Sequence, residues 1–322
     1  MRIAITGELG FIGTNLAKTI QSSDDTFVSL IGDPSLFHIS TGEPCVYNNS
    51  EKEWERVLIE KGIDVLVHNA AVVGTDVVAL NAEFSTLSNV MGTHTIARAA
   101  TKANVPVCYM GTTVIYDTQK YQDAVITETS DLNPKTFYGI QKLSAERIIK
   151  HNCKDWMIIR PLFAYGGVGD MNSLIAKTIY SSLNDVEFID MFLDPTKIKD
   201  YMHVQDFCNA VLTGIQEGLW QEDYNVAAET PYNTHEIVTF MSDVIGKDVS
   251  KLIRWHKSTD YLGNHVLSSR KFRSHSSWEP AISLPDGIDH SFRKILKADD
   301  SYDPLKHLNE AVKKGIDLTD YY

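Results

Sequence analysis

The sequence predicts an α/β fold built on a doubly wound parallel sheet, with a smaller C-terminal lobe. Two observations predict the sheet. Short apolar segments alternate with helical segments from residue 2 to residue 159, and a glycine-rich turn joins the first apolar segment to the first helical one. We expect residues 1–165 to form the first domain, with a return segment at about 200–225, and residues 166–322 to form mainly the second lobe.

The composition is that of an ordinary globular chain and argues against several classes of function. The chain has 322 residues, 43% of them hydrophobic, and a net charge of -12. This charge disfavours nucleic acid as a partner, because that needs a basic face. No apolar run reaches the roughly 18–20 residues that span a bilayer, so no membrane partner is expected. The scattered cysteines lack metal-ligand spacing and the N-terminus lacks a signal-peptide layout, so a cytoplasmic protein without a metal site is expected.

The first motif is a glycine-rich turn between a strand at residues 2–6 and a helix at residues 14–21. Strand, glycine-rich turn and helix together are typical of a dinucleotide site in a Rossmann fold. The glycines let the backbone approach a pyrophosphate, and the helix N-terminus supplies unpaired N–H groups and a partial positive charge. A plain strand-to-helix turn is the alternative. The predicted cofactor-binding residues of the turn are Gly7, Gly10, Phe11, Ile12 and Gly13.

An acidic residue follows the second predicted strand, residues 26–31. Asp33 lies about 20 residues after Gly13, the spacing at which a carboxylate binds the adenosine ribose hydroxyls of a dinucleotide. A carboxylate there would repel the 2′-phosphate of NADP, so Asp33 favours NAD as the cofactor. The alternative is that Asp33 and Pro34 only initiate a turn.

The middle of the chain continues the alternation. We expect a helix at residues 51–61, a strand at 63–68, one long helix at 81–103 and a fourth strand at 105–110. Small residues after the strand at 63–68 either let the chain pass close to a cofactor or merely pack tightly. In open α/β sheets, ligands bind beyond the carboxyl ends of the strands, which is where Thr112 lies. A hydroxyl at a strand end can instead satisfy its own backbone.

Tyr138 and Lys142 are four residues apart in a predicted helix that runs on to residue 150. Positions i and i+4 share a helix face, so the ammonium is expected beside the phenol. A nearby positive charge lowers the pKa of a tyrosine from about 10, and such a tyrosine can take a proton from a substrate hydroxyl. Taken alone, the pair is better explained as two surface residues that happen to be four apart, because this short pattern is common in helices. A fifth strand, residues 156–159, leads into Arg160 and Pro161.

Together these motifs resemble the extended short-chain dehydrogenases/reductases, and among them the NAD-dependent nucleotide-sugar epimerase/dehydratase family. The resemblance follows the family order over nearly the whole chain and is specific for the fold but not for the substrate. The residues that carry it are the Gly7, Gly10 and Gly13 turn, Asp33, residues 68–71, 89–93 and 111–116, Pro134, Tyr138, Lys142, residues 160–166, 199–206 and 224–226, Trp278 and Pro280.

The resemblance implies a reaction on a nucleotide-diphosphate sugar in which a hydride passes from a sugar carbon to NAD. Tyr138 would be the catalytic base, Lys142 would bind the nicotinamide ribose and lower the tyrosine pKa, and Thr112 would bind the reacting sugar oxygen. A homodimer formed through helices around residues 81–103 and 138–151 is also implied. Thr113 would contact the substrate, and the further cofactor-binding residues would be Asn69, Ala70, Ala71, Asn89 and Pro161, together with Tyr138 and Lys142.

Three residues of the C-terminal half are predicted to bind the substrate. Asn172 opens a predicted helix at residues 173–182, where the family often places a substrate phosphate, although an asparagine there is usually an N-cap. Lys199 is either a sugar or phosphate contact or a solvated side chain, and residues 199–206 are expected to begin a helix that returns to the first domain. Arg270 suits a bidentate contact with the nucleotide diphosphate.

Departures from the family pattern bear on the choice of reaction. The dehydratases carry an Asp-Glu pair directly after the catalytic threonine, whereas this chain has Thr113 and Val114, which disfavours a sugar 4,6-dehydratase. Many epimerases carry an asparagine that contacts the substrate where this chain has Phe163, so a reductase remains an alternative to an epimerase. Residues 110–116 also resemble the equivalent strand of GDP-fucose synthases, although Val114 replaces their cysteine.

The leading hypothesis is an NAD-dependent nucleotide-sugar epimerase with Thr112, Tyr138 and Lys142 as its catalytic set. The first alternative is a reductase of a nucleotide 4-keto sugar that consumes NADH or NADPH. The second is a catalytically idle protein that binds a dinucleotide and acts as a sensor or scaffold. The intact catalytic set argues against this second alternative, because tuned titratable groups mark functional sites.

Overall fold

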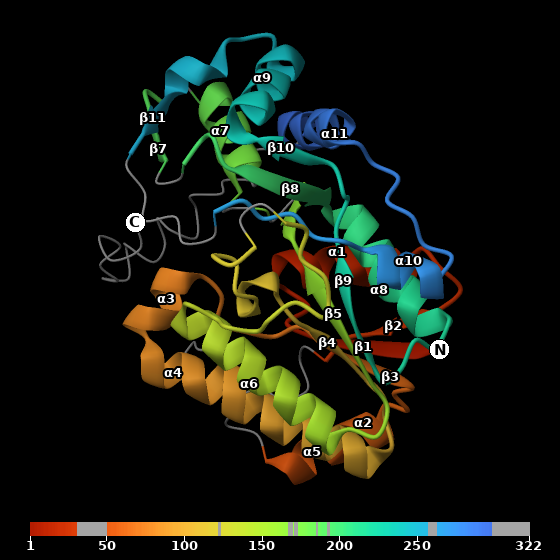
Figure 1. Ribbon diagram of the computed structural model, residues 1–322. Helices are drawn as coiled ribbons and strands as arrows, with labels where there is room; N and C mark the ends of the chain where they lie inside the picture. Colours follow the sequence, from red (N-terminus) through yellow and green to blue (C-terminus); the bar gives the residue numbers. More distant parts are fainter. Residues whose placement is uncertain are drawn as a thin grey trace, which may run out of the picture.

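The computed structural model of the chain describes residues 1–30, 50–121, 124–166, 170, 173–184, 186–191, 194–256 and 263–297 (Figure 1). Two predicted site residues, Asp33 and Asn172, lie outside these ranges. Among the described residues, no helix is long and apolar enough to cross a membrane. Within the same ranges, no group of three or more His, Cys, Asp or Glu side chains could hold a metal ion, and the described cysteines are buried free thiols.

Among the described residues, six parallel strands form the central sheet, in the order β2-β1-β3-β4-β5-β9. The chain first moves from β1 to β2 and then crosses to the other side of β1 for β3, so the strand order reverses there. In such sheets, ligands bind at the carboxyl ends of the strands beside this reversal. The predicted doubly wound α/β fold is confirmed. The strands are β1 (Arg2–Thr6), β2 (Thr26–Val28), β3 (Val65–His68), β4 (Val107–Met110), β5 (Trp156–Pro161) and β9 (Glu222–Val226).

Helices cover both faces of this sheet, because successive strand residues point to opposite sides. Ile3 and Ile5 of β1 face a hydrophobic core that they share with α1 (Phe11–Gln21) and α8 (Val204–Gln216). Ala4 faces a second core on the other side. Figure 1 shows the helices of that side grouped below the sheet; they are α2 (Glu51–Glu60), α5 (Thr93–Ala103) and α6 (Phe137–Asn152).

The long helix expected at residues 81–103 is interrupted, so the prediction of one continuous helix is wrong. The chain forms α3 (Thr75–Leu80), α4 (Ala82–Thr86), a π-helical turn η2 (Leu87–Gly92) and only then α5. Asn81 separates α3 from α4, because its φ of -115° and ψ of 50° are not helical. The wider π-helical turn carries Asn89, which hydrogen-bonds to the loop after β3, and such turns are frequent at functional sites.

The described part of the C-terminal half has its own hydrophobic core and two small sheets, one with strands in the order β10-β8-β6 and one with β11 beside β7. Lys199 and Asp200 lie in β8 and not in a helix, because residues 198–200 pair with β10 and residues 201–203 pair with β6. The elements are β6 (Phe163–Tyr165), α7 (Leu174–Leu183), β7 (Ile189–Met191), β8 (Ile198–His203), β10 (Pro231–Asn233), α9 (Thr234–Ile245), η4 (Val249–Leu252), β11 (Ile253–Trp255), α10 (Arg270–His275) and α11 (Leu284–Lys297).

Candidate active site

The glycine-rich turn contains two glycines that a larger residue could replace only if the backbone moved. Gly7 adopts a φ of +71°, a left-handed conformation that favours glycine, and a Cβ there would lie 2.9 Å from the Cα of Ala70. A Cβ on Gly13 would lie 2.1 Å from the carbonyl oxygen of Gly7. The turn therefore holds the end of β1, the start of α1 and the loop after β3 in direct contact.

The N-terminus of α1 faces into this turn without a side-chain cap. Gly10 is the N-cap residue, and within the described part of the chain the first turn of α1 has neither a capping side chain nor an acidic residue. The backbone N–H groups of Phe11, Ile12 and Gly13 have no acceptor within the helix, and they form the positive end of its dipole. These residues fit the pyrophosphate of a dinucleotide, because anions bind at such helix ends.

We expect Gly13→Ala to abolish dinucleotide binding, because the added methyl group would meet the Gly7 carbonyl oxygen at 2.1 Å and force the turn open. Gly246→Ala is the control, because Gly246 is the C-cap of α9, outside the turn, and a Cβ there would meet nothing within 4 Å. Calorimetric titration with NAD should show binding weakened by at least about a hundredfold in Gly13→Ala and unchanged within about twofold in Gly246→Ala. Equal affinities in the two variants would contradict this description of the turn.

The loop after β3 is fastened to the end of β1. The Thr6 hydroxyl accepts hydrogen bonds from the N–H groups of Asn69 at 3.2 Å and of Ala70 at 3.1 Å. The Asn69 side chain donates to the carbonyl oxygen of Gly7 at 3.2 Å. The structure therefore places the predicted cofactor residues Asn69 and Ala70, with Ala71 directly after them, against the glycine-rich turn.

Asn89 holds the same loop from the π-helical turn. Its side chain accepts a hydrogen bond from the Val72 N–H at 2.7 Å and donates to the Val72 carbonyl oxygen at 2.9 Å. It also donates to Oε1 of Gln141 on α6 at 2.9 Å. Asn89 is buried, so it shapes the predicted cofactor site through Val72 and ties that loop to the helix that carries Tyr138.

His68, at the end of β3, gives the fold a dependence on pH. Its ring is buried between the hydroxyls of Thr6 and Thr93, which lie 2.8 and 2.9 Å from its two nitrogens. Burial lowers the pKa of His68 from 6.5 to about 3. The unfolded chain takes up a proton at this histidine near pH 6.5 and the folded chain does not. The stability that a neutral His68 contributes is therefore fully present above pH 6.5 and is lost as the pH falls toward 3.

We expect His68 alone to lower the free energy of unfolding by up to about 1.4 kcal/mol for each unit of pH below 6.5. Urea unfolding between about pH 7 and pH 5 measures this slope. His68→Gln should reduce the slope by about one proton, because glutamine does not titrate. His151→Gln is the control, since His151 is exposed at the end of α6. A slope that is the same in wild type and His68→Gln would show that His68 is not the source.

Thr112, Tyr138 and Lys142 meet at the carboxyl end of β4. Thr112 follows this strand by two residues, and its hydroxyl is close enough to the phenol of Tyr138 to lower the pKa of that phenol. Lys142 donates from Nζ to the carbonyl oxygen of Met110, the last residue of β4, at 2.5 Å. The structure thus brings together the three residues that the sequence predicted to be catalytic.

Close packing sets the position of α6 over this strand end. The N-cap of α6 is Thr136, whose hydroxyl accepts a hydrogen bond from the Gly139 N–H at 3.0 Å. A Cβ on Gly139 would lie 2.8 Å from the carbonyl oxygen of Val114 in the turn η3 (Thr113–Ile115). Because Gly139 has no side chain, the first turn of α6 rests directly on η3, and Tyr138 reaches Thr112.

The pKa values at this strand end differ from the sequence prediction. Burial raises the pKa of Tyr138 to about 12, and the nearby Thr112 hydroxyl opposes this rise in pKa only in part. Burial lowers the pKa of Lys142 to about 7, and its Nζ lies 4.2 Å from the centroid of the Tyr109 ring. The ammonium is bound to the Met110 carbonyl oxygen. The predicted lowering of the tyrosine pKa by Lys142 is therefore wrong in this structure.

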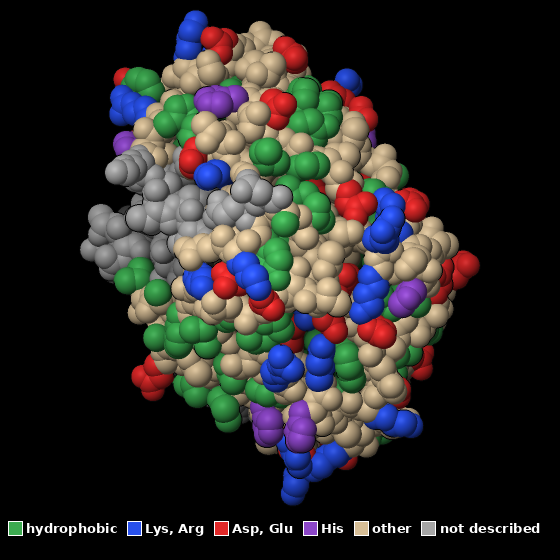
Figure 2. All heavy atoms as spheres, in the orientation of Figure 1, with side chains coloured by type: hydrophobic (Ala, Val, Ile, Leu, Met, Phe, Trp, Pro, Cys, Tyr) green, Lys and Arg blue, Asp and Glu red, His purple; other side chains and the backbone are tan. Residues whose placement is uncertain are grey.

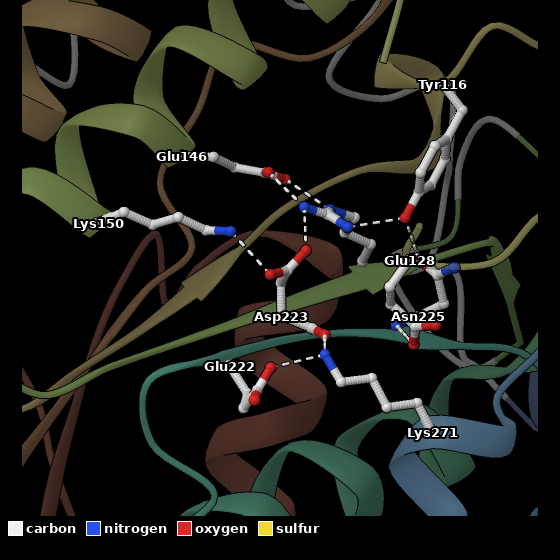
Figure 3. Close-up of polar contacts among 9 residues, drawn as sticks. Tyr116, Glu128, Glu146, Lys150, Glu222, Asp223, Asn225 and Lys271 are labelled. Carbon is white, nitrogen blue, oxygen red and sulfur yellow. Dashed lines mark hydrogen bonds and ion pairs between the residues drawn. The ribbon is translucent and has the colours of Figure 1, made fainter. Parts of the chain in front are cut away.

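A buried ionic network lies beside the catalytic helix (Figure 3). Arg160 is 1% exposed, and its guanidinium donates to Glu146 at 3.1 and 2.8 Å and to the Tyr116 hydroxyl at 2.7 Å. It also pairs with Asp223 on β9 at 2.6 Å. Figure 3 shows that Asp223 in turn faces Lys150 of α6, with which it pairs at 2.7 Å. The network therefore joins α6 to β5 and β9, and each of these charged groups has an oppositely charged partner.

Glu146 continues the stripe of Tyr138 and Lys142 along α6 at the next i+4 position. Burial lowers the pKa of Lys142, and the Glu146 carboxylate opposes this shift. A Cβ on Gly111 would lie 2.7 Å from Glu146 and 2.9 Å from Arg160, so the network packs directly under the end of β4. Glu146 was not predicted as a site residue, although the spacing of residues 138, 142 and 146 is visible in the sequence.

The remaining predicted site residues are more widely spread. Pro161 is the last residue of β5, and Thr113 is buried in η3. Lys199 is 6% exposed in β8, and its Nζ lies 5.5 Å from the centroid of the Phe163 ring. Arg270 is the exposed first residue of α10, and no contact among the described residues joins it to the catalytic set.

Comparison with known proteins identifies the family. The family model described as NAD dependent epimerase/dehydratase family matches residues 3–227, which is most of the chain. The chain belongs to this family, which is NAD-dependent. The family that the sequence resembles and the predicted cofactor, NAD, are therefore confirmed. The predicted homodimer and cytoplasmic setting stay predictions.

Relatives of known structure or name share this fold at low identity. The low-salt glycan biosynthesis protein Agl12 of Haloferax volcanii is 24% identical over 90% of this chain and 96% of its own length. The structure of DesIV, a dTDP-glucose 4,6-dehydratase from Streptomyces venezuelae with NAD and TYD bound, has a TM-score of 0.80 and 21% identity over 95% of this chain and 100% of its own. The structure of the UDP-glucuronic acid 4-epimerase from Bacillus cereus, in complex with UDP-glucuronic acid and NAD, has a TM-score of 0.79. Its sequence is 20% identical, and the match covers 92% of this chain and 99% of its own.

Proposed function

We propose that this protein is a nucleotide-sugar epimerase that oxidises a sugar hydroxyl transiently and reduces the resulting ketone again. One observation carries the proposal. Thr112, Tyr138 and Lys142 lie together at the carboxyl end of β4, where the Thr112 hydroxyl acts on the pKa of the Tyr138 phenol, and the two residues after Thr112 are not carboxylates. This arrangement can move one proton on and off a sugar oxygen.

Each member of the catalytic set has a defined task in this reaction. Tyr138 takes the proton of the sugar hydroxyl and later returns it, while Thr112 holds the same oxygen. NAD, when bound, supplies the hydride acceptor and later the hydride donor. Because the pKa of Tyr138 is about 12, proton removal near neutral pH needs a positive charge beside the phenol. Lys142, the nearest candidate on the same helix face, is bound to the Met110 carbonyl oxygen here, so it supplies that charge only if its ammonium turns toward the phenol when NAD and the sugar bind.

The residues after Thr112 favour an epimerase over a dehydratase. In the dehydratases that the sequence resembles, an Asp-Glu pair follows the catalytic threonine, and the Glu removes a proton beside the ketone. Thr113 and Val114 occupy these positions here, and neither can act as such a base. The relatives that are named as dehydratases therefore support the family and the fold, and the missing carboxylates support a different reaction.

A reductase of a nucleotide 4-keto sugar is the second candidate, and the environment of Phe163 favours it. The Phe163 ring lies 5.5 Å from that of Tyr201, between centroids, and beside Lys199. Phe163 stands where many epimerases of the family have an asparagine, so this position offers the sugar fewer hydrogen bonds. A reductase consumes one reduced cofactor in each turnover, whereas an epimerase consumes none.

Identifying the nicotinamide that the denatured protein releases tests this proposal. The freshly purified chain is denatured without added nucleotide, and the supernatant is analysed by mass spectrometry. We expect NAD, because an enzyme that returns its hydride has no need to exchange the cofactor. Release of NADP or NADPH would favour the reductase. A protein that releases no nucleotide and also fails to bind added NAD would contradict both candidates.

We also propose a homodimer formed through α6 and the region around η2. Large hydrophobic side chains are exposed there, and Figure 2 shows hydrophobic side chains grouped over the part of the surface where Figure 1 places α3, α4 and α6. Two copies of such a patch can cover each other about a two-fold axis. The patch consists of Leu80, Leu87, Met91, Phe137 and Ile140, which are 58%, 38%, 50%, 39% and 48% exposed.

The double substitution Met91→Glu and Ile140→Glu is expected to convert this dimer to monomers, because carboxylates cannot be desolvated in an apolar interface without a large penalty. Light scattering after gel filtration measures the mass. Ile59→Glu is the matched control, because Ile59 is 58% exposed on α2, outside the patch, and its substitution should leave the mass unchanged. A wild-type protein that is monomeric at micromolar concentration would contradict the dimer.

A further inference from the structure

Glu8 lies inside the glycine-rich turn, between Gly7 and Gly10, and is 8% exposed. Its Oε1 accepts a hydrogen bond from the Ser29 hydroxyl at 2.6 Å, and its Oε2 accepts one from the Leu30 N–H at 3.2 Å. Ser29 and Leu30 directly follow β2. The carboxylate of Glu8 is therefore held at the carboxyl end of β2, although the residue itself belongs to the turn after β1.

This position has a defined role in a doubly wound sheet that binds a dinucleotide. The adenosine ribose lies beyond the second strand, where an acidic side chain binds its hydroxyls and disfavours a 2′-phosphate. The sequence spacing predicted this role for Asp33, which lies outside the described residues. Glu8 already brings a carboxylate to the same strand end from the other side of the turn.

The surroundings of Glu8 fix its charge in place. Its carbonyl oxygen accepts a hydrogen bond from the Thr14 hydroxyl at 3.1 Å, so both its backbone and its side chain are bound. A Cβ on Gly13 would lie 2.8 Å from the Cα of Glu8, so the backbone of Glu8 packs closely against the first turn of α1. The carboxylate therefore keeps a constant position relative to the helix N-terminus at which the pyrophosphate is expected.

We propose that Glu8 determines the cofactor specificity and selects NAD over NADP at the adenosine ribose. The inference rests on the proposed NAD-dependent function and assigns the selection to the glycine-rich turn. A fixed negative charge repels the phosphate on the 2′-oxygen of NADP, and the repulsion is strong because the charge is screened little by water. The uncharged 2′-hydroxyl of NAD experiences no such repulsion.

Glu8→Gln tests the proposal, because glutamine keeps the size of the side chain and can still accept from the Leu30 N–H while the charge is lost. The dissociation constants for NAD and for NADP are measured by titration calorimetry on one preparation of the full chain, freed of bound nucleotide. We expect the ratio of the NADP constant to the NAD constant to fall by at least about tenfold in Glu8→Gln. A ratio of two constants from one preparation does not depend on how much of the variant is folded.

Two matched variants separate the charge of Glu8 from its hydrogen bond to Ser29 and from the charge of Asp33. Ser29→Ala removes the hydroxyl that binds Oε1 and leaves the charge, so the ratio should change by less than about threefold. Asp33→Asn removes the other acidic residue. If this variant lowers the ratio and Glu8→Gln does not, the proposal is overturned.

The role of Glu8 and the proposed function fail in different ways. Tight binding of NAD by the wild type, with an unchanged ratio in Glu8→Gln, contradicts the role of Glu8 alone. A wild-type chain that binds neither nucleotide contradicts the proposed function, and the role of Glu8 with it.

Discussion

Tyr138→Phe should slow turnover by about 10²–10⁴-fold while leaving the fold intact. The substitution removes only the phenolic oxygen, which is the proposed proton acceptor and lies near the Thr112 hydroxyl. The rest of the ring keeps its place in the first turn of α6 over η3. The measurement is the initial rate at saturating substrate, with the nucleotide sugar that the wild type converts, together with the thermal midpoint of each protein.

Tyr224→Phe is the matched control for this variant. The Tyr224 hydroxyl lies 3.0 Å from Nδ1 of His275, on β9 and outside the proposed catalytic set, so its loss also removes one tyrosine hydrogen bond. That loss should lower stability by about 1 kcal/mol and leave turnover unchanged. If Tyr138→Phe retained turnover within about threefold of wild type, the phenol could not be the base.

Arg160→Met should lower the free energy of unfolding by about 3–5 kcal/mol. Arg160 and Glu146 form a bidentate pair with side chains that are 1% and 2% exposed, so the substitution leaves a carboxylate buried without its partner. Asp223 loses the same arginine but keeps Lys150 at 2.7 Å, so most of the penalty falls on Glu146. Urea unfolding followed by circular dichroism measures the difference.

Two further variants show whether the unpaired charge is the cause. Arg160→Met combined with Glu146→Leu removes both charges and should recover much of the lost stability, because a buried ion pair contributes little over apolar residues of similar size. Arg273→Met breaks partly exposed pairs with Glu229 and with Glu279, where the arginine side chain is 35% exposed, and it should change stability by less than about 1 kcal/mol. A loss below about 1 kcal/mol in Arg160→Met would show that the network does not stabilise the fold.

The sheet could be predicted from the sequence because its signals are local. β1, β3 and β4 are short apolar runs, and every residue in them is buried except the first of β1. Their alternation with helical segments leads to the doubly wound arrangement. In the same way, the spacing of Tyr138 and Lys142 placed both on one helix face, and Thr112 followed from its position after a strand.

The features that depend on long-range contacts could not be predicted. The π-helical turn lies where Asn89 bonds to Val72 and Gln141, which are 17 and 52 residues away in the chain. The Glu8 carboxylate meets the Ser29 hydroxyl across 21 residues, so the acidic spacing that pointed to Asp33 gave no sign of it. The direction of the Tyr138 pKa shift depends on burial, which a four-residue spacing does not reveal.

The most direct test of the proposed function measures the product and the cofactor in one reaction. The purified enzyme is incubated with a panel of nucleotide sugars while the near-ultraviolet absorbance of NADH is followed. The products are then separated, and their masses are measured by mass spectrometry. An epimerase gives a product of the same mass as its substrate with no net change in NADH, which is the result we predict. A product lighter by one water, or consumption of one reduced cofactor for each product, would contradict the proposal.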